Sequence, residues 1–337
     1  MTTCGHPASS NHKPMLRLSR SACVGLLLLL QGCAHTRQFT TRTNVPTVQA
    51  YPHLLAVYEP WFGHPQHISV GYSSQDPLQI RKQIDHAKEL GISGFVVDWY
   101  GDREPFLDRS YALVQSIAAE KHFKVAMMYD ESDGDGQAAT DDALAAFDKF
   151  NETYLAPSAA GREAYLTYAD RPVIFIFPKG GHTDWSQVRA QTNKWNPRPL
   201  LVYEFRSTPY ADSLDGFYAW VNPGTKGWAT DGSNWGEDYL RGFYQQMQSK
   251  YPDKIVVGAA WAGFDDNKAS WGLNRHMSQR CGKTFSDTLN LAQENSLPDR
   301  PLPFVLVETW NDYEEGTAIE PGLAQCKADS EATSPGH

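Results

Sequence analysis

The alternation of two kinds of segment constrains this fold more than any other feature. From His53 onward, short apolar runs rich in β-branched and aromatic residues alternate with longer helical patterns. Such alternation predicts repeated βα units and a parallel sheet. The predicted strands cover residues 54–58, 94–99, 124–129, 173–177, 200–205, 216–220, 255–260 and 304–309, and the predicted helices cover residues 77–90, 105–121, 137–154, 234–251 and 284–295. Eight strands in this order predict a single-domain (β/α)₈ barrel, in which the helix after the eighth strand is absent or very short.

The composition excludes two classes of protein. The chain has 337 residues, of which 41% are hydrophobic and 20% are charged, and this apolar content argues against disorder. The formal net charge is −9, so we expect no nucleic acid or other polyanion as a partner. Nothing in the sequence indicates a repeat or a second chain, and we expect a monomer.

The N-terminus is typical of an exported protein. Lys13, Arg17 and Arg20 precede an apolar run at residues 22–30, which is too short to span a bilayer and suits a signal peptide. The run leads into residues 30–33, Leu-Gln-Gly-Cys, which resemble the bacterial lipoprotein box, and this resemblance implies that Cys33 receives lipid and becomes the first mature residue. The following Ala34 implies the outer membrane where the cell has one. The alternative is a soluble secreted protein in which Cys33 is incidental.

These features define the expected organisation of the chain. Residues 1–32 form the lipoprotein signal peptide, 33–50 a tether, 51–327 the barrel domain and 328–337 a disordered tail. Of the five cysteines, Cys4 and Cys23 leave with the signal peptide and Cys33 carries lipid. The remaining pair, Cys281 and Cys326, predicts one disulfide in an exported protein.

Acidic and aromatic residues gather where the predicted strands end. In barrels of this kind the functional side chains lie at the C-terminal ends of the strands. Carboxylates beside aromatic rings suit glycoside cleavage, because acids transfer protons and stabilise charge while rings hold the sugar. The candidates for substrate contact are Glu59, Trp61, His67, Asp98, Trp99, Tyr100, Asp130, Glu131, Glu204, Trp220, Asn222, Asp265, Trp310 and Tyr313, and the candidate catalytic pair is Asp312 and Glu315.

These residues resemble motifs of glycoside hydrolase families 71 and 99. The resemblance extends over about residues 55–321, with matching stretches at 58–63, 71–73, 91–101 and 263–266. The most specific stretch, Glu315-Gly316-Thr317-x-Ile319-Glu320-Pro321, resembles family 99, the endo-α-mannosidases, whereas Trp310-Asn311-Asp312-Tyr313 is closer to family 71, the α-1,3-glucanases. The resemblance implies a glycosidase that acts on an α-linked oligo- or polysaccharide.

The resemblance also implies roles for the two acids. Glu315 would protonate the leaving oxygen. Asp312 stands where family 99 carries a Glu that deprotonates the 2-hydroxyl of the sugar, with retention, whereas in family 71 an Asp acts on water, with inversion. Asp312 is one methylene shorter than that Glu, and Glu314 stands where family 99 has a His. A barrel that binds glycan without cleaving it is therefore the alternative.

Each candidate also has a structural alternative. Glu59 and Asp98 could pair with buried hydroxyls or arginines, the other acids could form ion pairs, His67 could cap a loop, and any one Trp could pack in the core. His64 and His67 lack the His-x-His pair expected of barrel metallohydrolases, and residues 131–142 match a calcium loop poorly. The sequence contains no phosphate loop, dinucleotide motif or Gly-x-Ser-x-Gly elbow, so we expect no metal and no cofactor.

Overall fold

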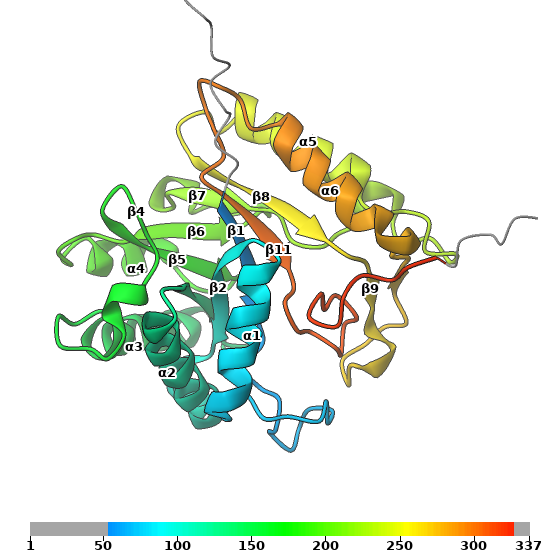
Figure 1. Ribbon diagram of the computed structural model, residues 1–337. Coiled ribbons are helices and arrows are strands. Elements are labelled where there is room, and N and C mark those ends of the chain that lie inside the picture. Colours follow the sequence, from blue (N-terminus) through cyan, green and yellow to red (C-terminus); the bar gives the residue numbers. More distant parts are fainter. Residues whose placement is uncertain (1–52, 327–337) are drawn as a thin grey trace, which may run out of the picture. The chain divides into compact units, whose positions relative to one another are not determined.

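The computed structural model describes residues 53–326 and contains a closed barrel of eight parallel strands (Figure 1). The strands are β1 (His53–Tyr58), β2 (Ile92–Trp99), β3 (Lys124–Asp130), β5 (Arg171–Phe177), β6 (Leu200–Glu204), β7 (Gly216–Tyr218), β8 (Ile255–Trp261) and β11 (Phe304–Glu308). Their order is β3-β2-β1-β11-β8-β7-β6-β5, and pairing of β3 with β5 closes the ring. The predicted (β/α)₈ barrel and all eight of its strands are therefore confirmed.

Six α-helices accompany the strands in the described part of the chain. They are α1 (Pro77–Glu89), α2 (Pro105–Glu120), α3 (Gly136–Tyr154), α4 (Trp185–Thr192), α5 (Glu237–Ser249) and α6 (Lys283–Glu294). Five agree with the predicted helices to within three residues, whereas α4 was not predicted. Only a 3₁₀ turn, Ala211–Ser213, stands between β6 and β7, and residues 309–326 contain no helix.

Shorter strands and 3₁₀ turns accompany the eight parallel strands and six helices. The strand β4 (Thr167–Tyr168) pairs antiparallel with β5, and β9 (Phe264–Asp265) pairs antiparallel with β10 (His276–Met277). Further 3₁₀ turns cover Gly101–Arg103, Arg162–Ala164, Gly224–Lys226, Asp266–Lys268 and Arg280–Gly282.

Local chemistry explains where two of the helices begin. The side chain of Asp76 accepts a hydrogen bond from the backbone N–H of Leu78, and Pro77 occupies the first helical position of α1. Asp184 caps α4 in the same way by accepting from the N–H of Ser186 at 3.0 Å. α5 begins three residues later than predicted, because Gly236 before it has a φ of +86° and ends the preceding loop.

Alternate residues of the strands pack on opposite sides of the sheet. Leu55 and Val57 of β1 belong to the cluster inside the barrel, together with Met128, Phe175 and Val257. Their neighbours in sequence face outward and form the larger cluster between the strands and the helices. Figure 1 shows α5 and α6 lying side by side, and both contact β8. The two clusters are what the period of two in a strand produces when both faces are buried.

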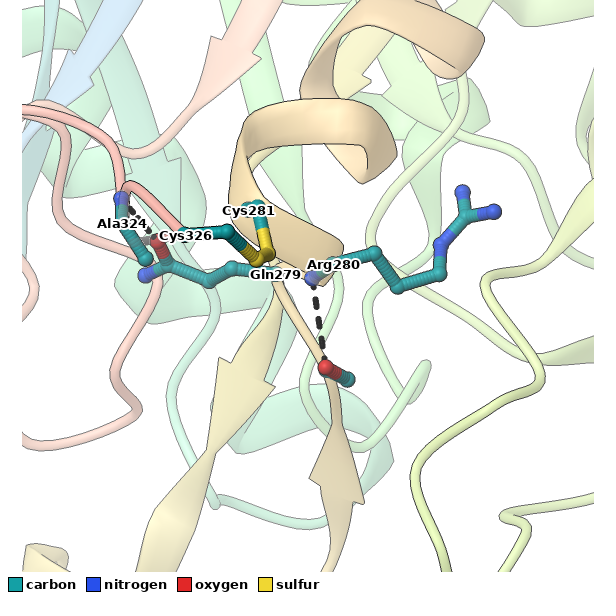
Figure 2. The surroundings of a disulfide bond; sticks show 6 residues. Gln279, Arg280, Cys281, Ala324 and Cys326 are labelled. Atoms are coloured by element: carbon teal, nitrogen blue, oxygen red, sulfur yellow. Dashed lines mark hydrogen bonds between the residues drawn. A yellow bond between two sulfur atoms is a disulfide. The ribbon is translucent and has the colours of Figure 1, made fainter. Parts of the chain in front are cut away.

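A disulfide joins Cys281 to Cys326 (Figure 2). Cys281 lies in the 3₁₀ turn just before α6, and Cys326 lies in the segment that follows β11. The backbone N–H of Ala324 also donates to the side-chain oxygen of Gln279 at 2.8 Å. These contacts attach the last described segment to the start of α6.

The predictions for Cys33, the signal peptide, the tether and the tail lie outside the described residues. Among residues 53–326, none of the helices is sufficiently long and apolar to cross a lipid bilayer.

Candidate active site

A cavity of about 850 Å³ opens at the C-terminal ends of the barrel strands. Residues at or just beyond the C-terminal ends of β1, β2, β3, β6, β7 and β11 contribute the polar and aromatic side chains that the sequence predicts for substrate contact. Those that line the cavity are Glu59, Trp61, His67, Asp98, Tyr100, Asp130, Glu204, Trp220, Asn222, Asp312 and Glu315. The closed barrel brings together residues up to 256 positions apart because every parallel strand ends at the same rim.

The loop after β11 carries both candidate catalytic acids on one tight turn. Oδ1 of Asp312 accepts hydrogen bonds of 2.9 Å from the backbone N–H groups of Glu314 and Glu315. The N–H of Asp312 donates to Oγ1 of Thr309 at 2.8 Å, which fixes the start of the turn. Gly316 closes it with a φ of +63°, a conformation that favours glycine. The side chains of Asp312 and Glu315 both face the cavity.

The two acids share a site that raises both of their pKa values. Burial raises the pKa of Asp312 to about 8, with a further increase from the charge of Glu315, and the two backbone N–H donors oppose this rise. Burial also raises the pKa of Glu315, although the Trp271 indole and Arg275 hold it down. The pair therefore retains a proton near neutral pH. The resemblance gives Asp312 the role of a base, which requires its carboxylate to be ionised. Burial of Asp312 disfavours this ionised form.

Two further carboxyls, from neighbouring strands, form the floor of the cavity. Glu59 is 4% exposed and Asp98 is 5% exposed. Within the described part of the chain, neither Oε2 of Glu59 nor Oδ1 of Asp98 has a hydrogen-bond partner. Burial raises the pKa of each well above its ordinary value, and neighbouring carboxylates raise it further. Such groups are placed to exchange hydrogen bonds with a polar ligand that enters the cavity.

The position of Glu59 depends on the loop after β11. Its backbone N–H donates to Oδ1 of Asn311 at 2.7 Å, and its carbonyl accepts from Nδ2 of the same residue at 2.9 Å. This paired contact joins the end of β1 to the residue before Asp312. The two acids are therefore fixed relative to each other by buried hydrogen bonds.

Cations neutralise part of the acidic lining. Nζ of Lys179 lies 3.1 Å from Oδ1 of Asp130 and 4.8 Å from the centroid of the Tyr100 ring. Burial raises the pKa of Asp130 to about 6 against the opposing charge of Lys179. Arg206 pairs with Glu204 at 2.9 Å. These pairs agree with the alternative that acids after β3 and β6 form ion pairs.

Aromatic rings form two parts of the wall. Trp61 stacks on His67 with a centroid separation of 4.7 Å and an interplanar angle of 6°. On a second part of the wall, Trp220 meets Phe177 edge to face at 5.1 Å. Trp220 lies beyond the end of β7, which stops two residues earlier than predicted, at Tyr218. Aromatic rings that line a cavity suit the apolar faces of sugars.

Three predicted contact residues are completely buried and do not line the cavity. Trp99 donates from its indole to Oδ1 of Asp108 at 3.0 Å, on the helix side of β2. Glu131 accepts from the backbone N–H groups of Gly181 and Thr183, at 2.6 and 2.7 Å. In this structure each of these two side chains lies outside the cavity lining and already has a structural partner.

Trp310 is the third, packed between Phe95 and His86 at 5.4 Å from each. Tyr313 and Asp265 are less buried but also lie outside the cavity lining. The hydroxyl of Tyr313 donates to Glu320 at 2.9 Å. Asp265 accepts locally from the backbone and side chain of Asn267. These three residues therefore make packing or loop contacts and lie outside the cavity lining.

Sequence reasoning missed seven cavity residues that carry charge or aromatic rings. They are Phe177, Lys179, Arg206, Trp228, Phe264, Trp271 and Arg275. Most of them lie several residues beyond a strand end, where the position in the sequence no longer indicates whether a side chain points into the cavity. The indoles in the Gly- and Asn-rich loops at 224–236 and 266–276 were the available signal, because exposed loops at a barrel mouth are where binding residues gather. In residues 53–326, no group of three His, Cys, Asp or Glu side chains is arranged to hold a metal ion.

Comparison with known proteins gives similarity in structure only. No known family model and no curated protein matches the sequence. The fold is similar to a solved structure of the family 99 endo-α-mannosidase from Bacteroides thetaiotaomicron, with a TM-score of 0.62 and 19% identity over 82% of this chain and 89% of that chain. It is also similar to a glycoside hydrolase-like protein, with a TM-score of 0.54 and 14% identity over 80% and 87% of the two chains. The chain therefore has the barrel fold seen in family 99.

Proposed function

We propose that this protein is a glycoside hydrolase that cleaves an α-linked glycan of the α-mannan or α-glucan type. One observation carries the proposal: the buried Asp312 and the partly buried Glu315 lie on one turn and face the same cavity as an aromatic wall. Two further carboxyls in that cavity, Glu59 and Asp98, each have one oxygen without a hydrogen-bond partner among the described residues. Proton transfer, charge stabilisation and sugar stacking are the three requirements of glycoside cleavage.

Each of the two acids transfers one proton in the proposed reaction. Glu315 donates its proton to the glycosidic oxygen as the bond to the anomeric carbon breaks. Asp312 accepts a proton either from the 2-hydroxyl of the sugar or from a water molecule. In the first case the 2-hydroxyl oxygen attacks the anomeric carbon and forms an epoxide-like intermediate, which water then opens with net retention. In the second case the water attacks the anomeric carbon directly and gives inversion. The competent state has Glu315 protonated and Asp312 ionised. Burial of Asp312 disfavours its ionised form and therefore opposes this arrangement of the shared proton.

The rest of the cavity binds the glycan. Trp61 and Trp220 offer ring faces, and Tyr100 and Asn222 offer polar groups along the wall. Glu59 and Asp98 exchange hydrogen bonds with sugar hydroxyls at the floor. The likeness of the fold to an endo-α-mannosidase supports an α-mannan as the first substrate to test.

We also propose that the mature protein is a monomer anchored by lipid at Cys33 to the bacterial cell envelope, in the outer membrane where one is present. The sequence of the N-terminus supports this proposal. Two or three acyl chains would hold the protein at a membrane without a spanning helix.

A substrate screen with product analysis tests the proposed activity. The protein is incubated with α-mannans and α-glucans, and NMR of the first product identifies its anomeric configuration. Retention supports the 2-hydroxyl route, and inversion supports attack by water. A protein that binds these glycans but cleaves none of them is the binding-only alternative and contradicts the proposal.

Two variants then test the roles. Glu315→Gln should lose about 10² to 10⁴ in rate on a substrate with a poor leaving group. It should lose much less on an activated aryl glycoside, whose leaving group departs without a proton. Asp312→Asn should lose activity on both substrates, because attack is impaired whatever the leaving group. Similar behaviour of the two variants on the activated substrate would overturn these roles.

A further inference from the structure

Trp271 makes a direct contact with the side chain of Glu315. Its indole Nε1–H donates to Oε1 of Glu315 at 2.9 Å. The ring also lines the cavity, at 6.3 Å from Trp61 and 6.2 Å from His67, while 43% of the residue stays exposed. Trp271 is thus both a partner of the proposed acid and part of the cavity rim.

The loop that carries Trp271 is held in place by a buried carboxylate. Asp266 is completely buried and accepts from the backbone N–H groups of Leu273 and Arg275, at 2.9 and 2.7 Å. Nε of Arg275 donates to the same carboxylate at 2.6 Å. These hydrogen bonds hold residues 266–275 in one conformation and so position Trp271 at the rim of the cavity.

A second contact joins this loop to the turn of the catalytic acids. The backbone N–H of Asp265 donates to the carbonyl oxygen of Glu315 at 2.7 Å. Gly316 lies so close to Asp265 that a Cβ at this position would meet its atoms at 3.0 to 3.1 Å. Both the backbone and the side chain of Glu315 are therefore positioned by residues 265–271.

The chemistry of indole then distinguishes the two oxygens of Glu315. An indole N–H is a donor only, so Oε1 must act as an acceptor whether Glu315 is neutral or ionised. Because the carbonyl oxygen of a neutral carboxyl is its better acceptor, this hydrogen bond favours the form of Glu315 that carries its acidic proton on Oε2. After proton transfer, the same N–H stabilises the carboxylate that remains.

We propose that Trp271 is a positioning residue that directs the proton of Glu315 to Oε2 and so toward the leaving oxygen. This inference rests on the proposed function, because it assigns to Trp271 the control of a proton that Glu315 donates. Trp271 takes no part in bond breaking. It determines from which oxygen the proton leaves.

Several charged groups surround Glu315 and must be held constant in a test. Arg275 opposes the rise in its pKa, whereas Asp266 and Glu314 add to it. Asp312 and Glu59 face it across the cavity. Trp271→Phe leaves all five in place and removes only the N–H donor while keeping an aromatic ring.

The first measurement is the titration of Glu315 by ¹³C NMR of its carboxyl carbon, assigned by its absence in Glu315→Gln. The pKa of Glu315 should rise in Trp271→Phe because a donor to the ionised form is lost. The control is Leu273→Ala on the same loop. The Leu273 side chain is 73% exposed and lies outside the cavity lining, so its removal should leave the titration unchanged.

The second measurement compares two leaving groups. Trp271→Phe should lose roughly tenfold to a hundredfold in kcat/KM on a poor leaving group, the worth of one hydrogen bond to a charged group. It should remain close to wild type on an activated aryl glycoside. A higher pKa increases the protonated fraction of Glu315, so the predicted loss does not come from a shortage of the acid form. It comes from the misdirected proton, together with weaker stabilisation of the carboxylate that remains after transfer. Leu273→Ala should match wild type on both substrates.

The outcomes separate this inference from the proposed function. An unchanged titration, or equal rates of Trp271→Phe and wild type on the poor leaving group, overturns the role of Trp271 while glycan cleavage by the wild type stands. A wild type that cleaves no glycan overturns the proposed function and the proton-directing role with it. In that case a shifted titration still shows that the indole contacts Glu315.

Discussion

Nδ1 of His67 lies 2.7 Å from Oε2 of Glu314, and the imidazole ring stacks on Trp61. Glu314 also accepts from the backbone N–H of Ile68 at 3.2 Å, and only 2% of the residue is exposed. The contact between His67 and Glu314 joins the loop after β1 to the turn that carries the candidate catalytic acids.

The contact between His67 and Glu314 should stabilise the fold. Glu314→Gln keeps the size of the side chain but removes its charge. We expect the free energy of unfolding to fall by about 1 to 3 kcal/mol, the worth of a hydrogen bond to a charged group. Urea unfolding measures this change. The matched background is His67→Phe, which keeps a ring to stack on Trp61 and should make Glu314→Gln much less costly. Additive effects in this double-mutant cycle would show that the two residues are not coupled.

The shared proton of Asp312 and Glu315 predicts a bell-shaped dependence of kcat/KM on pH. Activity needs Asp312 ionised and Glu315 protonated, and the alkaline limb should lie near pH 8, as a property of the pair. In Glu315→Gln the charge that raises the pKa of Asp312 is gone. On an activated aryl glycoside, its rate should therefore rise with pH through a midpoint below 8 and then stay level. An alkaline decline that persists in Glu315→Gln would contradict this reading.

Glu308 should make the protein less stable as the pH rises. It is completely buried at the end of β11, and neither of its carboxylate oxygens has a hydrogen-bond partner among the described residues. Burial, with the nearby charge of Glu204, raises the pKa of Glu308 well above its ordinary value. In the unfolded chain the value is about 4.3. Stability from this group is therefore fully present below about pH 4.3 and is lost as the pH rises through the folded pKa, by about 1.4 kcal/mol per pH unit.

Glu308→Gln removes this titration. Relative to wild type, its free energy of unfolding should increase between pH 5 and pH 8, as measured by urea unfolding at both values. Glu152→Gln, at an exposed position of α3, serves as the control and should follow wild type. A difference between Glu308→Gln and wild type that does not change with pH would argue against the burial of an unpaired acid.

The disulfide between Cys281 and Cys326 should contribute to stability. It closes a loop with a sequence separation of 45, for which the chain-entropy model gives as much as about 4 kcal/mol. We expect Cys281→Ser and Cys326→Ser to lower the free energy of unfolding by similar amounts, with no further loss in the double variant. Two free thiols in the unreduced, unfolded wild type, detected by alkylation, would disprove the bond.

The proposed anchor can be tested by fractionation. Cys33→Ser should move the protein from the membrane to the soluble fraction, because the tether alone has no apolar chain to insert. Retention of this variant in the membrane fraction would refute lipidation as the means of attachment.

The eight strands, and the end of the barrel at which the candidate site lies, could be predicted from the sequence alone. Runs such as residues 94–99 and 304–309 are apolar and rich in β-branched or aromatic residues. This local composition indicates a strand without knowledge of the rest of the fold. Once the barrel is assumed, the acids after β1, β2 and β11 must meet, because parallel strands end together. The missed helix, α4, has only eight residues, and five of them are polar or charged. It therefore gives little periodic signal.

The tertiary structure was needed to show which side chains line the cavity and in which direction their pKa values shift. Asp98 and Trp99 are adjacent in sequence, yet one faces the cavity and the other packs against Asp108, because successive side chains of a strand point to opposite sides. Trp271 meets Glu315 from a loop 44 residues away. The raised pKa of Asp312 depends on burial and on neighbouring charges, and both arise only when distant segments pack together.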